Sequence, residues 1–171
     1  MTARGIGAPF IFFAGIAIAC TMAVCQEQPL SVSPHQSVLK TDAVEYIYPE
    51  QVTVPAGKSS PVALHFRIKQ NLHINSHTPR AEYLIPTVFS IPETSGVQLA
   101  GATYPVGTDF TLPAAPDEKL SVYTGEFAIQ AKILANPGNH LVQAKLRYQA
   151  CDQNECLPPK TITVPIDVIG R

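Results

Sequence analysis

The sequence predicts an all-β protein, an immunoglobulin-like antiparallel β-sandwich preceded by a signal peptide. Several segments alternate apolar and polar residues with a period of two, which is typical of strands that bury one face. Turn residues separate these short segments, and the chain holds 16 prolines and 10 glycines to supply them. No window of a dozen residues has the 3.6-residue apolar period of a helix. Many short strands at this spacing favour a sandwich.

The expected strands follow one another from residue 43 to the end of the chain. The four clearest alternate along their whole length, and they are 62–68, 127–133, 142–150 and 162–168. The shorter candidates are 43–48, 51–54, 71–75, 84–91 and 97–104. Turns are expected at 55–57, 92, 136–139 and 158–159, where proline or glycine interrupts the pattern. The chain has no tryptophan and no long-range cysteine pair, so we expect the architecture of an immunoglobulin domain without its usual core residues.

The N-terminus has the parts of a secretory signal. Arg4 is the only charged residue before Glu27, and residues 10–19 form an apolar run. We expect a signal peptide over 1–25, or a lipoprotein signal over 1–19 that leaves Cys20 to be acylated. An uncleaved membrane anchor is the alternative, because a run of this length can span a bilayer. Each version places the rest of the chain in the periplasm or otherwise outside the cytoplasm, where disulfides persist.

Behind the signal we expect a tether and one domain. Residues 26–40 are polar, contain proline and lack periodicity, which is typical of a flexible tether. Residues 41–171 have the length of a single domain. Without Arg4, 11 Lys and Arg stand against 13 Asp and Glu, a formal charge of −2 with no basic stripe. We therefore expect no nucleic-acid partner.

Cys151 and Cys156 are the two cysteines of the predicted mature domain, and they flank the turn of its terminal hairpin. Four intervening residues can bring their Cα atoms within the roughly 4.4–6.8 Å that a disulfide needs. The pair is either a structural bridge or a dithiol that switches. As a bridge it closes a loop of about six residues, which contributes only roughly 2 kcal/mol. A domain of this size can bury enough core without it.

A metal site is the weaker interpretation of the same residues. The two cysteines could join His73 and His77 as zinc ligands, but structural zinc sites usually have tighter cysteine spacing. Pro79 prevents a helix that would place both histidines on one face, so we interpret them as polar residues of a strand end and a loop. We expect no metal and no cofactor.

Two carboxylates lie between the thiols in the sequence. Asp152 and Glu155 disfavour a further negative charge, and the nearest cation along the chain is Lys160. A thiolate should therefore be scarce here at neutral pH. This is typical of a relay protein that reacts only when a partner brings the activated thiolate.

The string YQACDQNECLPPKTITVPIDV at 148–168 resembles the active-site hairpin of the N-terminal periplasmic domain of the thiol:disulfide interchange protein DsbD. Segments 72–91 and 117–129 are also similar to this family, so the resemblance covers about 41–170. It implies an immunoglobulin-like sandwich whose cysteine pair cycles between disulfide and dithiol. By position, Cys156 matches the cysteine that forms mixed disulfides with partners, and Cys151 matches the one that resolves them. Tyr148, Asp152 and Glu155 flank the pair.

The resemblance also implies partners. In the family, the domain takes electrons from the thioredoxin-like domain of a membrane electron transporter. It passes them to periplasmic acceptors such as a disulfide isomerase or another thioredoxin-like protein. The family's membrane domain and C-terminal thioredoxin domain are missing from this sequence, so we expect a separate reductant.

Two departures from the family pattern concern the site. Four residues separate the cysteines here, where well-known members have five. Those members shield the pair with a cap loop that carries an aromatic residue. The corresponding region is roughly 104–120, with Phe110 as the candidate cap residue; a solvent-facing or edge-packed phenylalanine is the alternative.

Three functions therefore stand open. The first is an exported thiol–disulfide relay domain that works through Cys151 and Cys156, related to the protein-disulfide reductases. The second is a β-sandwich interaction or adaptor module with an inert disulfide. The third is delivery of reductant or copper during cytochrome or oxidase maturation.

Overall fold

The structure is a computed structural model that describes residues 42–47, 51–93 and 96–171. The predicted signal over 1–25, the lipidation candidate Cys20 and the tether over 26–40 lie outside these residues. Within the described ranges, no helix is long and apolar enough to cross a membrane.

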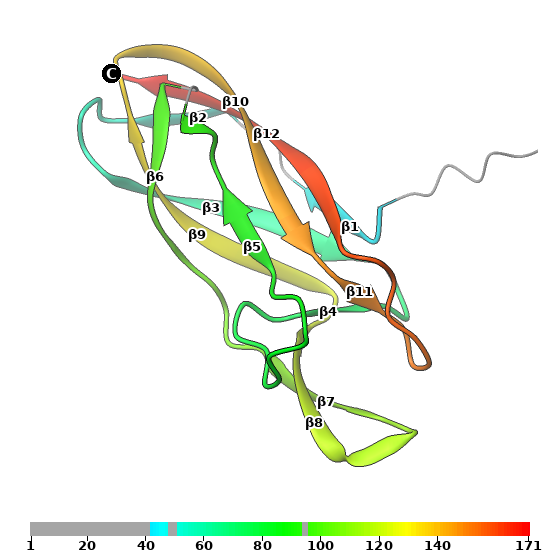
Figure 1. The fold of residues 1–171 in the computed structure, drawn as a ribbon. Coiled ribbons are helices and arrows are strands. Elements are labelled where there is room, and N and C mark those ends of the chain that lie inside the picture. The colour runs from blue at the N-terminus through cyan, green and yellow to red at the C-terminus, as the bar shows by residue number, and fades with distance from the viewer. Residues whose placement is uncertain (1–41, 48–50, 94–95) are drawn as a thin grey trace, which may run out of the picture. The chain divides into compact units, whose positions relative to one another are not determined.

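The described residues form twelve strands. They are β1 (Val44–Ile47), β2 (Gln51–Val54), β3 (Ser60–Ile68), β4 (His73–Asn75), β5 (Val88–Ser90), β6 (Val97–Thr103), β7 (Thr108–Leu112), β8 (Ala115–Tyr123), β9 (Glu126–Ala135), β10 (Gly138–Tyr148), β11 (Ala150–Cys151) and β12 (Lys160–Gly170). Figure 1 shows their arrangement. The predicted all-β fold is confirmed.

Two of the three sheets make the sandwich. One has the order β1-β3-β9-β6 and the other β2-β12-β10-β5. Their inward side chains form one apolar cluster, because every second residue of β3, β9, β10 and β12 is buried. Phe66, Ile129 and Leu146 are among its fully buried members. The fold is an immunoglobulin-like β-sandwich, as the alternation predicted.

The third sheet, β11-β4-β8-β7, extends from one end of the sandwich. Its β7–β8 hairpin overlaps the segment 104–120 that the sequence interpretation treated as a loop, and β8 continues three residues beyond it. The hairpin has few buried positions, so its sequence lacks the strict apolar alternation that marks a half-buried strand. Another difference concerns β2, which pairs with β12 in parallel, in a sandwich predicted to be antiparallel. The strand predicted over 84–91 is also shorter, because only Val88–Ser90 pairs with β10.

The long hairpin of β10 and β12 carries the candidate site. Its ladder runs from Gly138 opposite Gly170 to Tyr148 opposite Lys160. Beyond Tyr148 the chain leaves this sheet, and β11 pairs instead with β4 in the third sheet. The connection between β11 and β12 therefore lies where the sandwich and the third sheet meet (Figure 1). Cys151 ends β11, and Cys156 lies in this connection.

Candidate functional site

A disulfide joins Cys151 to Cys156, with their Cα atoms 4.0 Å apart. The two residues face each other in an antiparallel bridge. Backbone hydrogen bonds flank the pair, from Leu157 N–H to Ala150 C=O at 2.8 Å and from Asp152 N–H to Glu155 C=O at 3.0 Å. This is the non-hydrogen-bonded type of pair, in which opposite residues lie closest. The pairing type accounts for a short Cα separation, and the 4.0 Å observed is shorter than the roughly 4.4–6.8 Å expected from the sequence.

The turn between the cysteines is held by the side chain of Asp152. Its Oδ1 accepts hydrogen bonds from the N–H groups of Asn154 at 2.7 Å and Glu155 at 2.8 Å. These bonds hold the pKa of the Asp152 carboxyl below its usual value. Asp152 is thus the ionised acceptor of a tight turn, and Glu155 contributes its backbone while its side chain is exposed.

The two cysteines differ in their access to solvent. Cys151 is 2% exposed, whereas Cys156 is exposed. Cys156 is therefore the cysteine that a macromolecule approaching this end of the hairpin would meet first. Since a disulfide is opened by attack on one of its sulfurs, this asymmetry selects which cysteine would first bond to a partner.

His73 is the residue of β4 that lies directly opposite Cys151 of β11. It is 2% exposed, and its ring centroid is 4.2 Å from that of Phe110. Burial lowers the pKa of His73, while the nearby charge of Asp152 acts in the opposite direction. The sequence interpretation of His73 as a polar strand-end residue gave its place in the chain but missed its burial beside a cysteine.

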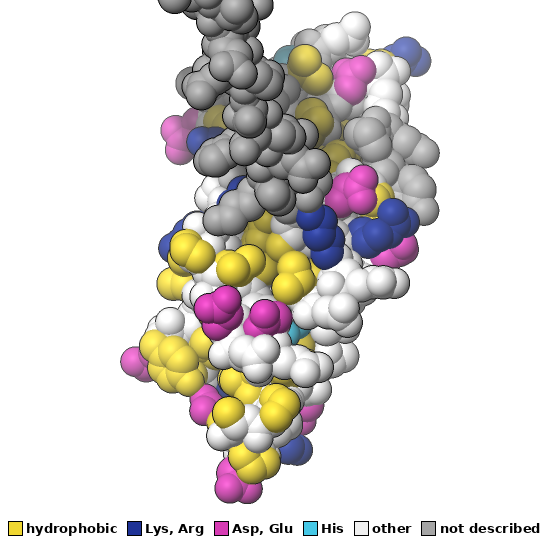
Figure 2. Space-filling view, turned by 90° about the vertical axis from the view of Figure 1, so that its right-hand side faces the viewer, with side chains coloured by type: hydrophobic (Ala, Val, Ile, Leu, Met, Phe, Trp, Pro, Cys, Tyr) yellow, Lys and Arg dark blue, Asp and Glu magenta, His cyan; other side chains and the backbone are white. Residues whose placement is uncertain are grey.

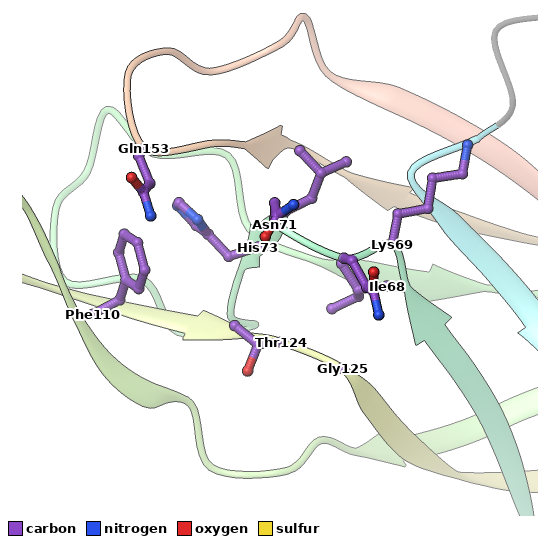
Figure 3. Close-up of a pocket in the computed structure, with 10 residues that line it drawn as sticks. Ile68, Lys69, Asn71, His73, Phe110, Thr124, Gly125 and Gln153 are labelled. Carbon is purple, nitrogen blue, oxygen red and sulfur yellow. The ribbon is translucent and has the colours of Figure 1, made fainter.

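A pocket of about 260 Å³ opens beside this histidine (Figure 3). His73, Phe110 and Gln153 gather at one end of the view, while Ile68 and Lys69 lie at the other. Phe110 comes from β7, the candidate cap segment, and is half-buried against the His73 ring. Its place next to the residue opposite Cys151 is compatible with a capping role, which stays a prediction.

A second pocket, of about 310 Å³, lies beside the connection between β11 and β12. Tyr148 lines it together with Leu157, Pro158 and Pro159. Tyr148 is buried, which raises the pKa of its hydroxyl, whereas Leu157 is 39% exposed. Figure 2 shows one face of the molecule, on which hydrophobic side chains gather near the middle, acidic side chains lie below them, and a further hydrophobic area lies at the lower end.

Other residues raised by the sequence lie apart from the cysteines. The ring of His77 stacks on Tyr104 at 3.7 Å, and its Nδ1 lies 2.9 Å from the carbonyl of Thr87. Lys160 forms an ion pair with Asp42. In the described part of the chain, no three His, Cys, Asp or Glu side chains gather in a way that could hold a metal ion.

Comparison with known families places the chain. The model of the family described as "Thiol:disulfide interchange protein DsbD, N-terminal" matches residues 42–167. A solved structure, that of the Neisseria meningitidis DsbD N-terminal domain in the reduced form, is similar at 18% identity and a TM-score of 0.46. That match covers 67% of this chain and 82% of the other. A comparison with curated proteins found no match. The chain belongs to the family of the N-terminal domain of the thiol:disulfide interchange protein DsbD.

Proposed function

We propose that this protein is an exported thiol–disulfide relay domain that passes reducing equivalents through Cys151 and Cys156. The family is one of thiol–disulfide interchange. The observation that carries the proposal is the asymmetry of the pair, an exposed Cys156 bonded to a buried Cys151. A purely structural bridge has no need for one accessible and one protected sulfur, whereas a relay uses both.

The relay step moves two electrons. A thiolate of the donor attacks Sγ of Cys156, which forms a mixed disulfide and releases Cys151 as a thiolate that takes up a proton. The second thiol of the donor, as its thiolate, then attacks the donor's first sulfur, which is bonded to Cys156 in the mixed disulfide. This attack closes the donor's disulfide and releases Cys156. The donor leaves oxidised and the pair leaves as a dithiol. With an acceptor disulfide the same steps run in reverse, and Cys151 resolves the mixed disulfide.

The proposed partners follow from this chemistry. The donor is the thioredoxin-like domain of a membrane electron transporter, and the acceptor is a periplasmic disulfide isomerase or another thioredoxin-like protein. The surface beside Cys156 supports such docking, because Leu157, Pro158 and Pro159 are exposed next to the reactive sulfur. We place the protein in the periplasm, with a lipid at Cys20 as its membrane tether if the lipoprotein signal is used.

Trapping the mixed disulfide tests the proposal. In a chain with Cys20→Ser and Cys25→Ser, so that only the pair remains, Cys151→Ser should accumulate a mixed disulfide through Cys156 with a thioredoxin whose second, resolving cysteine is replaced by serine and whose first cysteine carries thionitrobenzoate as the leaving group. The product would be measured by mass spectrometry without reductant. The matched control Cys156→Ser should trap little, because Cys151 is buried.

The outcomes separate the functions. Trapping by Cys156→Ser alone would reverse the two roles. If neither variant trapped thioredoxin, the disulfide would be a structural element of an interaction module, and the relay proposal would be wrong.

A further inference from the structure

We propose that His73 is the proton acceptor for Cys151 when Cys151 closes the disulfide and releases a partner. This inference rests on the relay proposed above and adds a residue to it. In the closing step, Cys151 must lose its thiol proton before it attacks Sγ of Cys156, and a thiol buried in apolar surroundings gives up that proton reluctantly.

The position of His73 relative to Cys151 is fixed by the sheet. The two residues are direct partners of the β4–β11 pairing, with Ile74 opposite Ala150 as the next pair. Directly opposite residues point to the same face, with Cβ atoms about 4.5–5.5 Å apart. The imidazole therefore emerges beside the side chain of Cys151, on the face opposite to Ile74.

The imidazole also has a nitrogen available. His73 Nε2 is buried and has no hydrogen-bond partner in the part of the chain that the structure describes. Leaving a buried nitrogen unpaired is unfavourable, and such groups in native proteins call for an explanation. A nitrogen that takes part in a proton transfer only when the disulfide is open explains why it lacks a partner in the oxidised form.

The surroundings suit a neutral base that is transiently charged. Burial lowers the pKa of His73, so the ring is neutral at neutral pH and can accept a proton. The charged groups around it are Asp152, from the turn after β11, and Lys69, on the wall of the shared pocket. The other residues that line the pocket, among them Phe110 from β7 and Thr124 after β8, carry no charge. Asp152 stabilises the imidazolium once it forms.

Closure transfers one proton and exchanges one disulfide bond for another. His73 takes the proton from the thiol of Cys151, and the resulting thiolate attacks Sγ of Cys156 in the mixed disulfide. The bond between Cys151 and Cys156 forms as the bond between Cys156 and the partner sulfur breaks. The partner leaves as a thiolate, and the proton on His73 passes to it or to water. In the reducing direction, the imidazolium protonates Cys151 as it leaves.

The test measures closure directly, using one equivalent of Ellman's reagent on the reduced chain with Cys20→Ser and Cys25→Ser. Exposed Cys156 reacts first and releases one thionitrobenzoate, and closure by Cys151 releases the second in a first-order phase. His73→Gln should slow this second phase by about a hundredfold at neutral pH, the scale of general base catalysis. The first phase should be unchanged.

The pH profile separates proton transfer from packing. In the wild type, closure should be nearly independent of pH around neutrality and should slow only at pH values below 6.5, because the pKa of His73 is lowered from that ordinary value. In His73→Gln, closure should rise about tenfold per pH unit, because only the ionised fraction of the thiol reacts. The matched control is His77→Gln, which alters a histidine that also stacks on an aromatic ring, and it should keep the wild-type profile.

Each contrary result overturns a definite part of the account. A His73→Gln variant that closes at the wild-type rate, or that is slower with an unchanged pH profile, would overturn the role of His73 and leave the relay standing. Absence of the second phase in the wild type would overturn the relay and this inference with it. If His73→Gln does not fold, a tenfold rise per pH unit in the wild type would by itself overturn the proton transfer.

Discussion

The sandwich core and the cysteine end of this protein differ in the kind of residue that they bury. The core between the two large sheets is an apolar cluster drawn from alternating positions. The buried polar residues in the described part of the chain are His73, Asn75, Ser76 and Thr87, and all belong to β4 or to the segment that follows it. Apolar packing stabilises the fold, whereas buried polar residues contribute less to stability. The polar residues lie at the cysteine end, where they can take part in chemistry.

Most of these polar groups are paired. Thr87 Oγ1 donates to the carbonyl of Asn75 at 2.6 Å, and the hydroxyls of Ser76 and Ser121 lie 2.8 Å apart. Asn75 Nδ2 donates to the Ile85 carbonyl and to Gln149 Oε1. The network holds β4 beside its sheet neighbour β11, which ends at Cys151, and it leaves His73 Nε2 and Asn75 Oδ1 without partners among the described residues. The hydrogen bonds thus hold the cysteine end in place, although two of its buried polar atoms have no partner among the described residues.

The largest effect is expected in the core. Phe66→Ala removes a fully buried ring that stacks on Phe127 with centroids 5.3 Å apart. It should lower the free energy of unfolding by about 3–5 kcal/mol, in the oxidised and the reduced protein alike. Urea unfolding measures it. Val106→Ala, at a residue 94% exposed, is the control and should change stability by less than about 0.5 kcal/mol. A loss below about 1 kcal/mol for Phe66→Ala would contradict this account of the core.

A smaller effect is expected from opening the disulfide. Loss of a loop closure worth roughly 2 kcal/mol should lower the melting temperature by about 4–8 °C in a domain of this size. Both redox states should unfold cooperatively, because the core strands do not depend on the bridge. Thermal melts with and without reductant measure the shift in melting temperature and the cooperativity of both redox states. A reduced protein without a cooperative transition would show that the pair is a structural staple.

A still smaller effect should follow the charge state of His73. Because its folded pKa is lowered below the usual 6.5, the unfolded chain binds the proton more readily. The stability contributed by the neutral ring is present above pH 6.5 and is lost as the pH falls from there toward the folded pKa. His73→Phe, which cannot be protonated, should remove this part of the pH dependence in urea unfolding. An unchanged pH profile in the variant would mean that His73 is not buried in its neutral form.

The smallest effect is expected in the turn. Asp152→Ala removes the acceptor for the Asn154 and Glu155 amides, which should exchange with solvent faster, while the melting temperature hardly changes. Asp152→Asn keeps a side-chain oxygen and is the matched control. Since the folded pKa of Asp152 is lowered, the protection is present above about pH 3.8 and is lost as the pH falls through the folded value. Equal exchange in both variants would contradict the assigned turn.

The sandwich could be predicted because its strands bury one face each. Val62, Leu64, Phe66 and Ile68 alternate with exposed residues in β3, and the same holds for β10 and β12, so a local pattern reports the global position. The cysteine pair could be found from its spacing and its place before Pro158-Pro159. These features are local in sequence, which is why the sequence reveals them.

The rest of the site depends on contacts between distant segments. The role proposed for His73 depends on its pairing with Cys151, which lies 78 positions further along the chain. Nothing in the string LHINSH indicates this partner. Strand β4 is buried on both faces, so it has no alternation to mark which side its histidine takes. The β7–β8 hairpin was missed for a different reason: residues 116–119 are exposed, and its buried residues are confined to Leu120, Val122 and Tyr123 at the end of β8. The burial difference between Cys151 and Cys156 likewise follows from the third sheet and not from the hairpin sequence.

The reduction potential of the Cys151–Cys156 pair tests the central claim most directly. Equilibration of the chain carrying Cys20→Ser and Cys25→Ser with glutathione redox buffers, followed by mass spectrometry of alkylated thiols, gives the value. A pair that relays electrons should lie between thioredoxin and protein disulfide isomerase, at about −270 to −180 mV. A potential below about −300 mV would mark a structural disulfide and would contradict the relay.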